Sequence, residues 1–196
     1  MTTPTRPGLF SIGHSNHLLS KFLGLLRDNS IKVVADIRSV PRSRFSPHFN
    51  RPALQAALEG AGVRYEFLGQ AMGGRPLGDE YYDAEGHVLY GRLAGSASFL
   101  DGMRRIVDEA RRARVSILCS EEDPAGCHRR LLVGRVLARN SVEILHIRGD
   151  GGLQTEEDLL RAEEPHSRTS RQTLFTSAEE SKWRSVKPVA RPRSRR

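Results

Sequence analysis

Short apolar runs alternate along this chain with segments in which apolar residues recur at helical spacing. Five runs have the length of a buried strand, and they cover residues 9–12, 31–37, 63–68, 115–119 and 142–147. The helical segments cover residues 18–26, 52–58, 99–110, 131–137 and 155–164. Alternation of this kind favours parallel strands joined by right-handed crossovers. We therefore expect a Rossmann-like three-layer α/β sandwich with a mostly parallel sheet of five strands.

The positive charge of the chain is concentrated near its C-terminus. The formal net charge is +8, and residues 165–196 carry +7 of it, as nine Lys or Arg against two Glu. These residues are poor in apolar side chains and contain prolines, so we expect a basic, disordered tail. Residues 8–164 are nearly neutral and are expected to form a single α/β domain. The tail could contact nucleic acid or another polyanion, or it could serve only to keep the protein soluble.

Composition limits the location of the protein and the groups it could carry. Two cysteines in 196 residues do not make a disulfide framework, which is typical of a reducing compartment. The chain has no apolar run of about 18 residues, and residues 1–8 lack the apolar centre of a secretory signal. We expect a cytoplasmic protein with no membrane partner. The sequence has no Gly-x-Gly-x-x-Gly after its first strand, no Walker loop and no Gly-x-Ser-x-Gly elbow, so we predict no cofactor.

The connections that follow the predicted strands differ from those that precede them. The preceding ones are short, whereas the following ones carry histidine, arginine, glutamate and cysteine side chains. The following connections cover residues 13–16, 38–48, 69–96, 120–130 and 146–152. In a parallel sheet they all leave at one edge, where open α/β folds bind ligands, so we predict a functional site there. The longest connection, residues 69–96, contains tyrosines and glycines, and we expect it to form a lid.

Cys127 is the candidate nucleophile of this site. It precedes a predicted helix and is followed by His128 and Arg129, so positive charge and the helix dipole are expected to lower the pKa of its thiol. A thiolate at neutral pH is a nucleophile. A small buried cysteine that only packs under the sheet is the alternative. A cysteine-phosphatase loop is excluded, because Val133 stands where that loop needs an arginine.

Cys119 lies inside an apolar run, so we expect it to belong to the core. The two cysteines could also pair under oxidation. Together with His14 and His128 they could bind zinc, but the spacing matches no recognised ligand pattern, and we predict no metal.

Two side chains at the predicted edge could transfer protons. His14 follows the first strand, and a histidine titrates near neutral pH, although a lone histidine is more often structural. Glu121 follows the fourth strand and could be a general base or hold an arginine. Next to His14, Ser15 or Asn16 could cap the following helix and contact the substrate.

Several arginines at the same edge predict a site for an anion. Arg38 lies two residues after Asp36 on the same strand face, so the two could form a buried ion pair with a structural role only. Arg42 and Arg44 alternate through a proline-bounded loop, where they could bind phosphate or simply be solvated. The predicted substrate-binding residues are Ser15, Asn16, Asp36, Arg38, Arg42, Arg44, His128 and Arg129.

Five linked motifs resemble a known family. They are Ser11-Ile-Gly-His-Ser-Asn16, Asp36-Ile-Arg38 with Pro41-Arg-Ser-Arg44, Leu68-Gly69 with Gly73-Gly74, Leu118-Cys119-Ser-Glu121, and Cys127-His-Arg129. In this order the chain resembles domain of unknown function 488 from about Phe10 to Ile147. The resemblance implies a bacterial or archaeal cytosolic protein with an enzyme-like set of polar residues. It supports the chosen site residues, adds no reaction, and does not include the basic tail.

Two functions are consistent with these residues. The first is an enzyme with Cys127 as thiolate nucleophile, His14 or Glu121 moving protons, and arginines that hold a phosphate-bearing substrate such as a nucleotide or a nucleic-acid segment. The second is a non-catalytic nucleic-acid-binding accessory protein that uses the arginine loop and the basic tail, with Cys127 merely packed.

Overall fold

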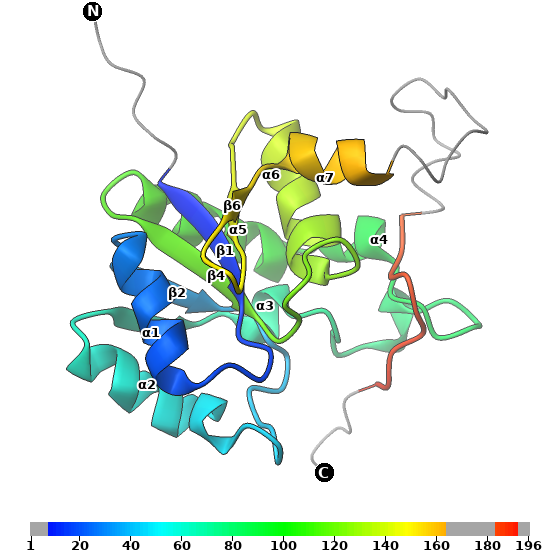
Figure 1. Cartoon of the computed structure of the whole chain (residues 1–196). Coiled ribbons are helices and arrows are strands. Elements are labelled where there is room, and N and C mark those ends of the chain that lie inside the picture. The colour runs from blue at the N-terminus through cyan, green and yellow to red at the C-terminus, as the bar shows by residue number, and fades with distance from the viewer. Residues whose placement is uncertain (1–7, 164–182, 192–196) are drawn as a thin grey trace, which may run out of the picture.

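A six-stranded sheet forms the centre of the protein (Figure 1). The computed structural model describes residues 8–163 and 183–191. The strands are β1 (Leu9–Gly13), β2 (Val33–Asp36), β3 (Arg64–Phe67), β4 (Val115–Cys119), β5 (Leu145–Ile147) and β6 (Leu153–Gln154), in the order β3-β2-β4-β1-β5-β6. The first five run parallel, as predicted, and β6 pairs antiparallel with β5. The prediction of five strands missed β6, because a strand of two residues has no periodicity to detect.

Helices cover both faces of the sheet and enclose two apolar cores (Figure 1). On one face lie α1 (Leu19–Asp28), the short η1 (Pro47–Phe49) and α2 (Arg51–Gly60). On the other lie α3 (Gly69–Met72), α4 (Tyr90–Ala94), α5 (Ala97–Ala110) and the π-helical η3 (Arg129–Gly134), which continues into α6 (Arg135–Arg139). We call the core on the side of α5 the α5 core and the core on the side of α1 the α1 core. Neighbouring strand residues point to opposite faces, so Ile117 lies in the α5 core and Leu118 in the α1 core. The last helix is α7 (Glu156–Glu163).

The connection over residues 69–96 packs into the protein rather than forming a lid. It contains α3, η2 (Asp79–Tyr81) and α4, and its side chains Tyr82, Val88, Tyr90 and Leu93 are buried in the α5 core. The expectation of a lid rested on length and glycine content, and the burial of these apolar side chains corrects it.

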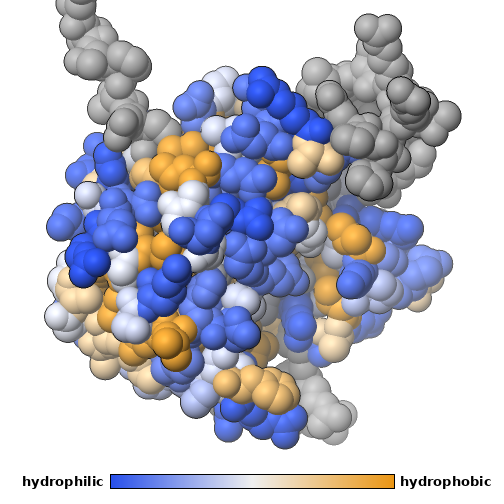
Figure 2. All heavy atoms as spheres, viewed as in Figure 1, coloured by the Kyte–Doolittle hydropathy of each residue, from blue (hydrophilic) through white to orange (hydrophobic). Residues whose placement is uncertain are grey.

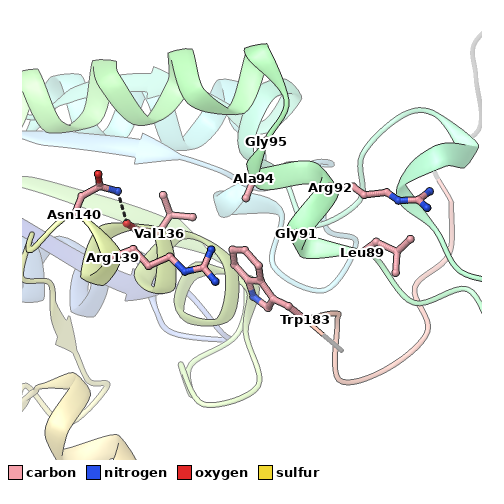
Figure 3. Close-up of a pocket in the computed structure, with 9 residues that line it drawn as sticks. All are labelled: Leu89, Gly91, Arg92, Ala94, Gly95, Val136, Arg139, Asn140 and Trp183. Atoms are coloured by element: carbon pink, nitrogen blue, oxygen red, sulfur yellow. Dashed lines mark hydrogen bonds between the residues drawn. The ribbon is translucent and has the colours of Figure 1, made fainter. Parts of the chain in front are cut away.

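The C-terminal segment, residues 183–191, packs against the domain beside α4 (Figure 1). Trp183 is 5% exposed, and its Nε1 donates a hydrogen bond of 2.6 Å to the carbonyl of Leu131. Its indole also contacts the guanidinium groups of Arg135 and Arg139, at 4.7 and 4.8 Å from the ring centre. Figure 3 shows Arg139 beside the indole. A buried tryptophan and backbone hydrogen bonds to residues 86–90 therefore order a segment that we expected to be disordered. The rest of the expected tail lies outside the described residues.

The face shown in Figure 2 is mostly hydrophilic, and its apolar residues form small separate patches. Within residues 8–163 and 183–191, no helix combines the length and apolar character needed to cross a membrane.

Candidate functional site

A cleft of about 700 Å³ opens at the carboxyl edge of the sheet. The connections after β1 and β2 lead to helices on one face, and the connection after β4 leads to η3 on the opposite face. Adjacent parallel strands whose connections separate in this way leave a crevice at their carboxyl ends. His14, Arg38, Cys119, Glu121 and His128 all line this crevice. Its volume lies in the ordinary range for small-molecule sites, about 300–1,000 Å³.

The ends of β1 and β4 are held tightly together under this cleft. The backbone N–H groups of His14 and Ser15 donate to the carbonyls of Cys119 and Ser120, at 3.0 and 2.8 Å. Gly13 is needed for this approach, because a Cβ there would lie 1.6 Å from the carbonyl oxygen of Glu121. The loop after β4 is thereby fixed against β1, which places its side chains on the cleft floor.

The two cysteines form a hydrogen-bonded pair, and only Cys119 lines the cleft. Their sulfur atoms are 3.1 Å apart, with the Cys127 thiol donating to Cys119 Sγ. This hydrogen bond, aided by the charge of buried Arg129, lowers the pKa of Cys119. Burial, and then the contact with Cys119, raises the pKa of Cys127 well above its ordinary value, and Cys127 is 0% exposed. The expectation of a thiolate at Cys127 is corrected, because its side chain turns under the loop while Cys119 faces the cleft.

His128 lies beside both sulfurs in an orientation that fixes its tautomer. Nε2 is 3.3 Å from the carbonyl oxygen of Ile37, which can only accept, so Nε2 carries the proton. Nδ1 is then an acceptor, 3.5 Å from Cys119 Sγ and 3.9 Å from Cys127 Sγ. A Cβ on Gly74 would come within 2.8 Å of the imidazole Cγ, so a glycine is required to let this ring sit here. His128, expected to bind substrate, lines the cleft and has both sulfurs within 4 Å of Nδ1.

His14 is a neutral histidine in the cleft wall. Its Nδ1 lies 2.8 Å from the carbonyl of Ser15 and its ring stacks on Phe49 at 4.4 Å. Burial, followed by the charge of Arg38, lowers the pKa of His14 to about 4. It can accept a proton through Nε2 but holds it weakly at neutral pH. The expectation that it titrates near neutral pH is corrected by this burial.

The predicted ion pair of Asp36 and Arg38 is present and orients Arg38 at the cleft. Nε and Nη2 of Arg38 donate to the two carboxylate oxygens of Asp36 at 2.8 and 2.6 Å, and Nη1 donates to the carbonyl of Phe49 at 2.9 Å. The Tyr65 hydroxyl donates to the same carboxylate at 2.8 Å. These contacts use three of the five guanidinium N–H groups. Among the described contacts, one N–H on Nη1 and one on Nη2 have no partner and can bind a ligand. Asp36 is 0% exposed and acts through Arg38.

The other predicted substrate-binding residues divide into those at the cleft and those away from it. Arg42 lines the cleft, whereas the exposed Arg44 does not. Ser15 and Asn16 also lie outside the lining, and neither caps α1, whose N-cap is Leu18.

Arg129, expected to bind phosphate, is fully buried beneath the loop after β4. Nη2 donates to the carbonyl of Glu122 at 2.5 Å, Nη1 donates to the carbonyl of Glu121, and Nε donates to the hydroxyl of Ser11 at 3.3 Å. Its guanidinium therefore holds the shape of the loop and is out of reach of a ligand. This corrects the prediction for Arg129.

Several lining residues were not predicted as site residues from the sequence, among them Arg75, Tyr90 and Lys187. Arg75 follows the Gly73-Gly74 pair, and that pair was a signal for a close backbone approach. Lys187 lies in a segment that composition marked as disordered, so no local pattern could place it at the site.

Comparison with models of known families found a match to the description Domain of unknown function DUF488 over residues 18–136. The chain belongs to this family. The match includes Asp36, Arg38, both cysteines and His128, whereas His14 and Lys187 lie outside it. Comparison with curated proteins found no match, and neither did comparison with solved structures.

The sulfur and imidazole groups of this DUF488 domain could also bind a metal ion. Among the described residues, Cys119, Cys127 and His128 form the cluster whose donor atoms all lie within 4.8 Å of one another. Zinc–sulfur bonds of about 2.3 Å in a tetrahedron would hold two sulfurs ~3.8 Å apart. The observed separation of 3.1 Å fits a hydrogen-bonded thiol pair better.

A buried network beneath the cleft resembles a catalytic triad but has no access to substrate. Ser11 Oγ lies 2.6 Å from Nδ1 of His146, and His146 Nε2 lies 2.9 Å from Glu156 Oε1. Ser11 and His146 are both 0% exposed, and burial lowers the pKa of His146. Glu156 also accepts from Arg130 at 2.9 Å. The network connects β1, β5 and α7 and is structural in this DUF488 protein.

Proposed function

We propose that this DUF488 protein is a cytoplasmic enzyme that uses the Cys119 thiolate on a phosphate-bearing substrate in a Rossmann-like ligand crevice. One observation carries the proposal: Cys119, 4% exposed, lines a cleft that also contains Arg38 and Arg42, and its Sγ lies 3.5 Å from an imidazole acceptor. A nucleophile, a base within reach and a third group that orients the base are the parts that nucleophilic catalysis requires. Here the third group is the carbonyl of Ile37.

The roles follow from the contacts. His128 accepts the proton of the Cys119 thiol at Nδ1, and the thiolate attacks an electrophilic atom of the substrate. Arg38, fixed by Asp36, presents two N–H groups to an anionic group of the substrate. Guanidinium groups commonly form bidentate hydrogen bonds with such groups. Arg42 and Lys187 add positive charge at the walls. The substrate class is a nucleotide or a nucleic-acid segment.

Alkylation of Cys119 tests the proposal. Reaction with iodoacetamide, followed by peptide mass analysis, is expected to modify Cys119 with an apparent pKa below about 8.5, the value of an ordinary thiol. Adenosine monophosphate is expected to slow the reaction. Arg42→Ala weakens this protection several-fold, whereas Arg44→Ala, outside the cleft, keeps it.

Two results would overturn the proposal. One is alkylation of Cys119 with the pH profile of an ordinary thiol, and the other is the same protection in Arg42→Ala and Arg44→Ala. A non-catalytic nucleic-acid-binding protein would instead bind polyanions with steep salt dependence and leave the thiol unreactive.

A further inference from the structure

Cys127 has no role in the nucleophilic attack proposed above, yet its position is specific. Its sulfur is 3.1 Å from Cys119 Sγ and it is 0% exposed, so no molecule in the cleft can reach it. Cys119, in contrast, is 4% exposed and lines the cleft. The atom that Cys127 can attack is therefore Cys119 Sγ, once that sulfur carries a leaving group. A disulfide between the two needs the sulfurs to approach from 3.1 Å to about 2.05 Å, a movement of about 1 Å.

The base is placed for the same step. Nδ1 of His128 faces both sulfurs, at 3.5 and 3.9 Å, so one imidazole can take the proton from each thiol in turn. An attacking thiol at the cleft wall and an enclosed second thiol within reach of it are the parts of a thiol–disulfide exchange site. The lining carries four basic side chains, Arg38, Arg42, Arg75 and Lys187, against the acidic Glu121 and Asp123, and this balance favours an anionic substrate.

We propose that the protein is a dithiol reductase for a disulfide that carries phosphate groups, with Cys119 as the attacking thiol and Cys127 as the resolving thiol. This inference rests on the proposed function, which it narrows to thiol–disulfide exchange.

The exchange proceeds in two balanced steps. The Cys119 thiolate attacks one sulfur of the substrate RSSR, so that a Cys119–SR bond forms, the substrate S–S bond breaks, and RS⁻ leaves with the proton that His128 had taken from Cys119. Cys127 then gives its proton to His128 and attacks Cys119 Sγ. The Cys119–Cys127 bond forms, the Cys119–SR bond breaks, and the second RS⁻ leaves with that proton. Two electrons pass from the thiol pair to the substrate, and an external dithiol reduces the protein disulfide again.

Coenzyme A disulfide is the probe, because its halves carry phosphates, and pantethine is the matched control with the same disulfide and no phosphate. The reduced protein is mixed with each probe without air, and free thiols and intact protein mass are measured. The wild-type protein is expected to release two thiols per chain and to end with a Cys119–Cys127 disulfide. Cys127→Ser is expected to release one thiol and keep one coenzyme A on Cys119, and Cys119→Ser to release none. Pantethine is expected to react at least tenfold more slowly.

The outcomes separate this inference from the proposed function. A wild-type protein that keeps coenzyme A on Cys119 and releases one thiol refutes the role of Cys127, and the wild-type stoichiometry decides this even if Cys127→Ser does not fold. Equal rates with pantethine refute a phosphate-bearing substrate. If neither disulfide reacts while iodoacetamide still modifies Cys119 at low pH, the reductase activity is refuted and the nucleophilic role of Cys119 is retained. Loss of both reactions overturns both proposals.

Discussion

The buried imidazole of His14 makes the stability of the fold depend on pH in a calculable way. Its pKa is lowered to about 4 in the folded protein by burial and by the charge of Arg38, against about 6.5 in an unfolded chain. The unfolded state therefore binds more protons between these two values. The stabilisation is complete above pH 6.5, is lost as the pH falls toward 4, and amounts to about 3 kcal/mol, since one pKa unit corresponds to ~1.36 kcal/mol.

Urea unfolding between pH 7.5 and 4.5 measures this effect. The free energy of unfolding of the wild-type protein is expected to fall by roughly 2.5 kcal/mol or more over this range, because His146, whose pKa burial also lowers, acts in the same direction. His14→Gln removes the larger contribution, so its slope is expected to be much shallower. Lys21→Gln, exposed on α1, keeps the wild-type slope. If His14→Gln loses stability with falling pH as steeply as the wild-type protein, the assignment of a neutral, buried His14 is refuted.

Three substitutions test other parts of the structure. Gly74→Ala is expected to push the His128 imidazole away and slow the alkylation of Cys119 at least tenfold. The control Gly126→Ala, whose added Cβ has no atom within 4 Å, is expected to leave the rate unchanged. Equal rates in the two variants would contradict the role of the imidazole. Trp183→Ala removes a buried indole and is expected to lower the free energy of unfolding by about 3–5 kcal/mol in urea titrations, and a change below about 1 kcal/mol would show that the C-terminal segment is not anchored there. Glu156→Gln breaks the ion pair with Arg130 and weakens the bond to His146, and thermal unfolding is expected to show a loss of about 1–3 kcal/mol; an unchanged melting temperature would argue against the buried network.

The parallel sheet, and the gathering of the connections that follow its strands at one edge, could be predicted from the sequence, because both depend on periodicity. The runs around Val34 and Ile117 have the continuous apolar character of strands covered on both faces, and parallel strands must end at one edge. The pairing of Asp36 with Arg38 followed from their spacing of two residues and the cost of an unpaired buried carboxylate.

The identity of the reactive thiol could not be predicted, because it depends on the direction of side chains in an irregular loop. Cys119 ends a strand and is buried as expected, 4% exposed, but the end of β4 also forms the cleft floor. Cys127 and Arg129 precede and begin a helix, yet both point inward once Gly13 lets the loop close against β1. Trp183 was missed because its pocket is built from residues far away in the sequence, and a composition argument counts charges without seeing such an anchor.

The cleft is lined by residues that the family match covers and by residues that lie outside it. Both sulfurs and the imidazole lie in the stretch shared with the family, residues 18–136, whereas Ser185, Val186 and Lys187 form a wall from outside it. Lys187 thus adds to the cleft a positive charge that comes from outside the family stretch. Exchanging residues 185–187 while Trp183 keeps the segment anchored is a route to new ligands that leaves both thiols and the imidazole in place.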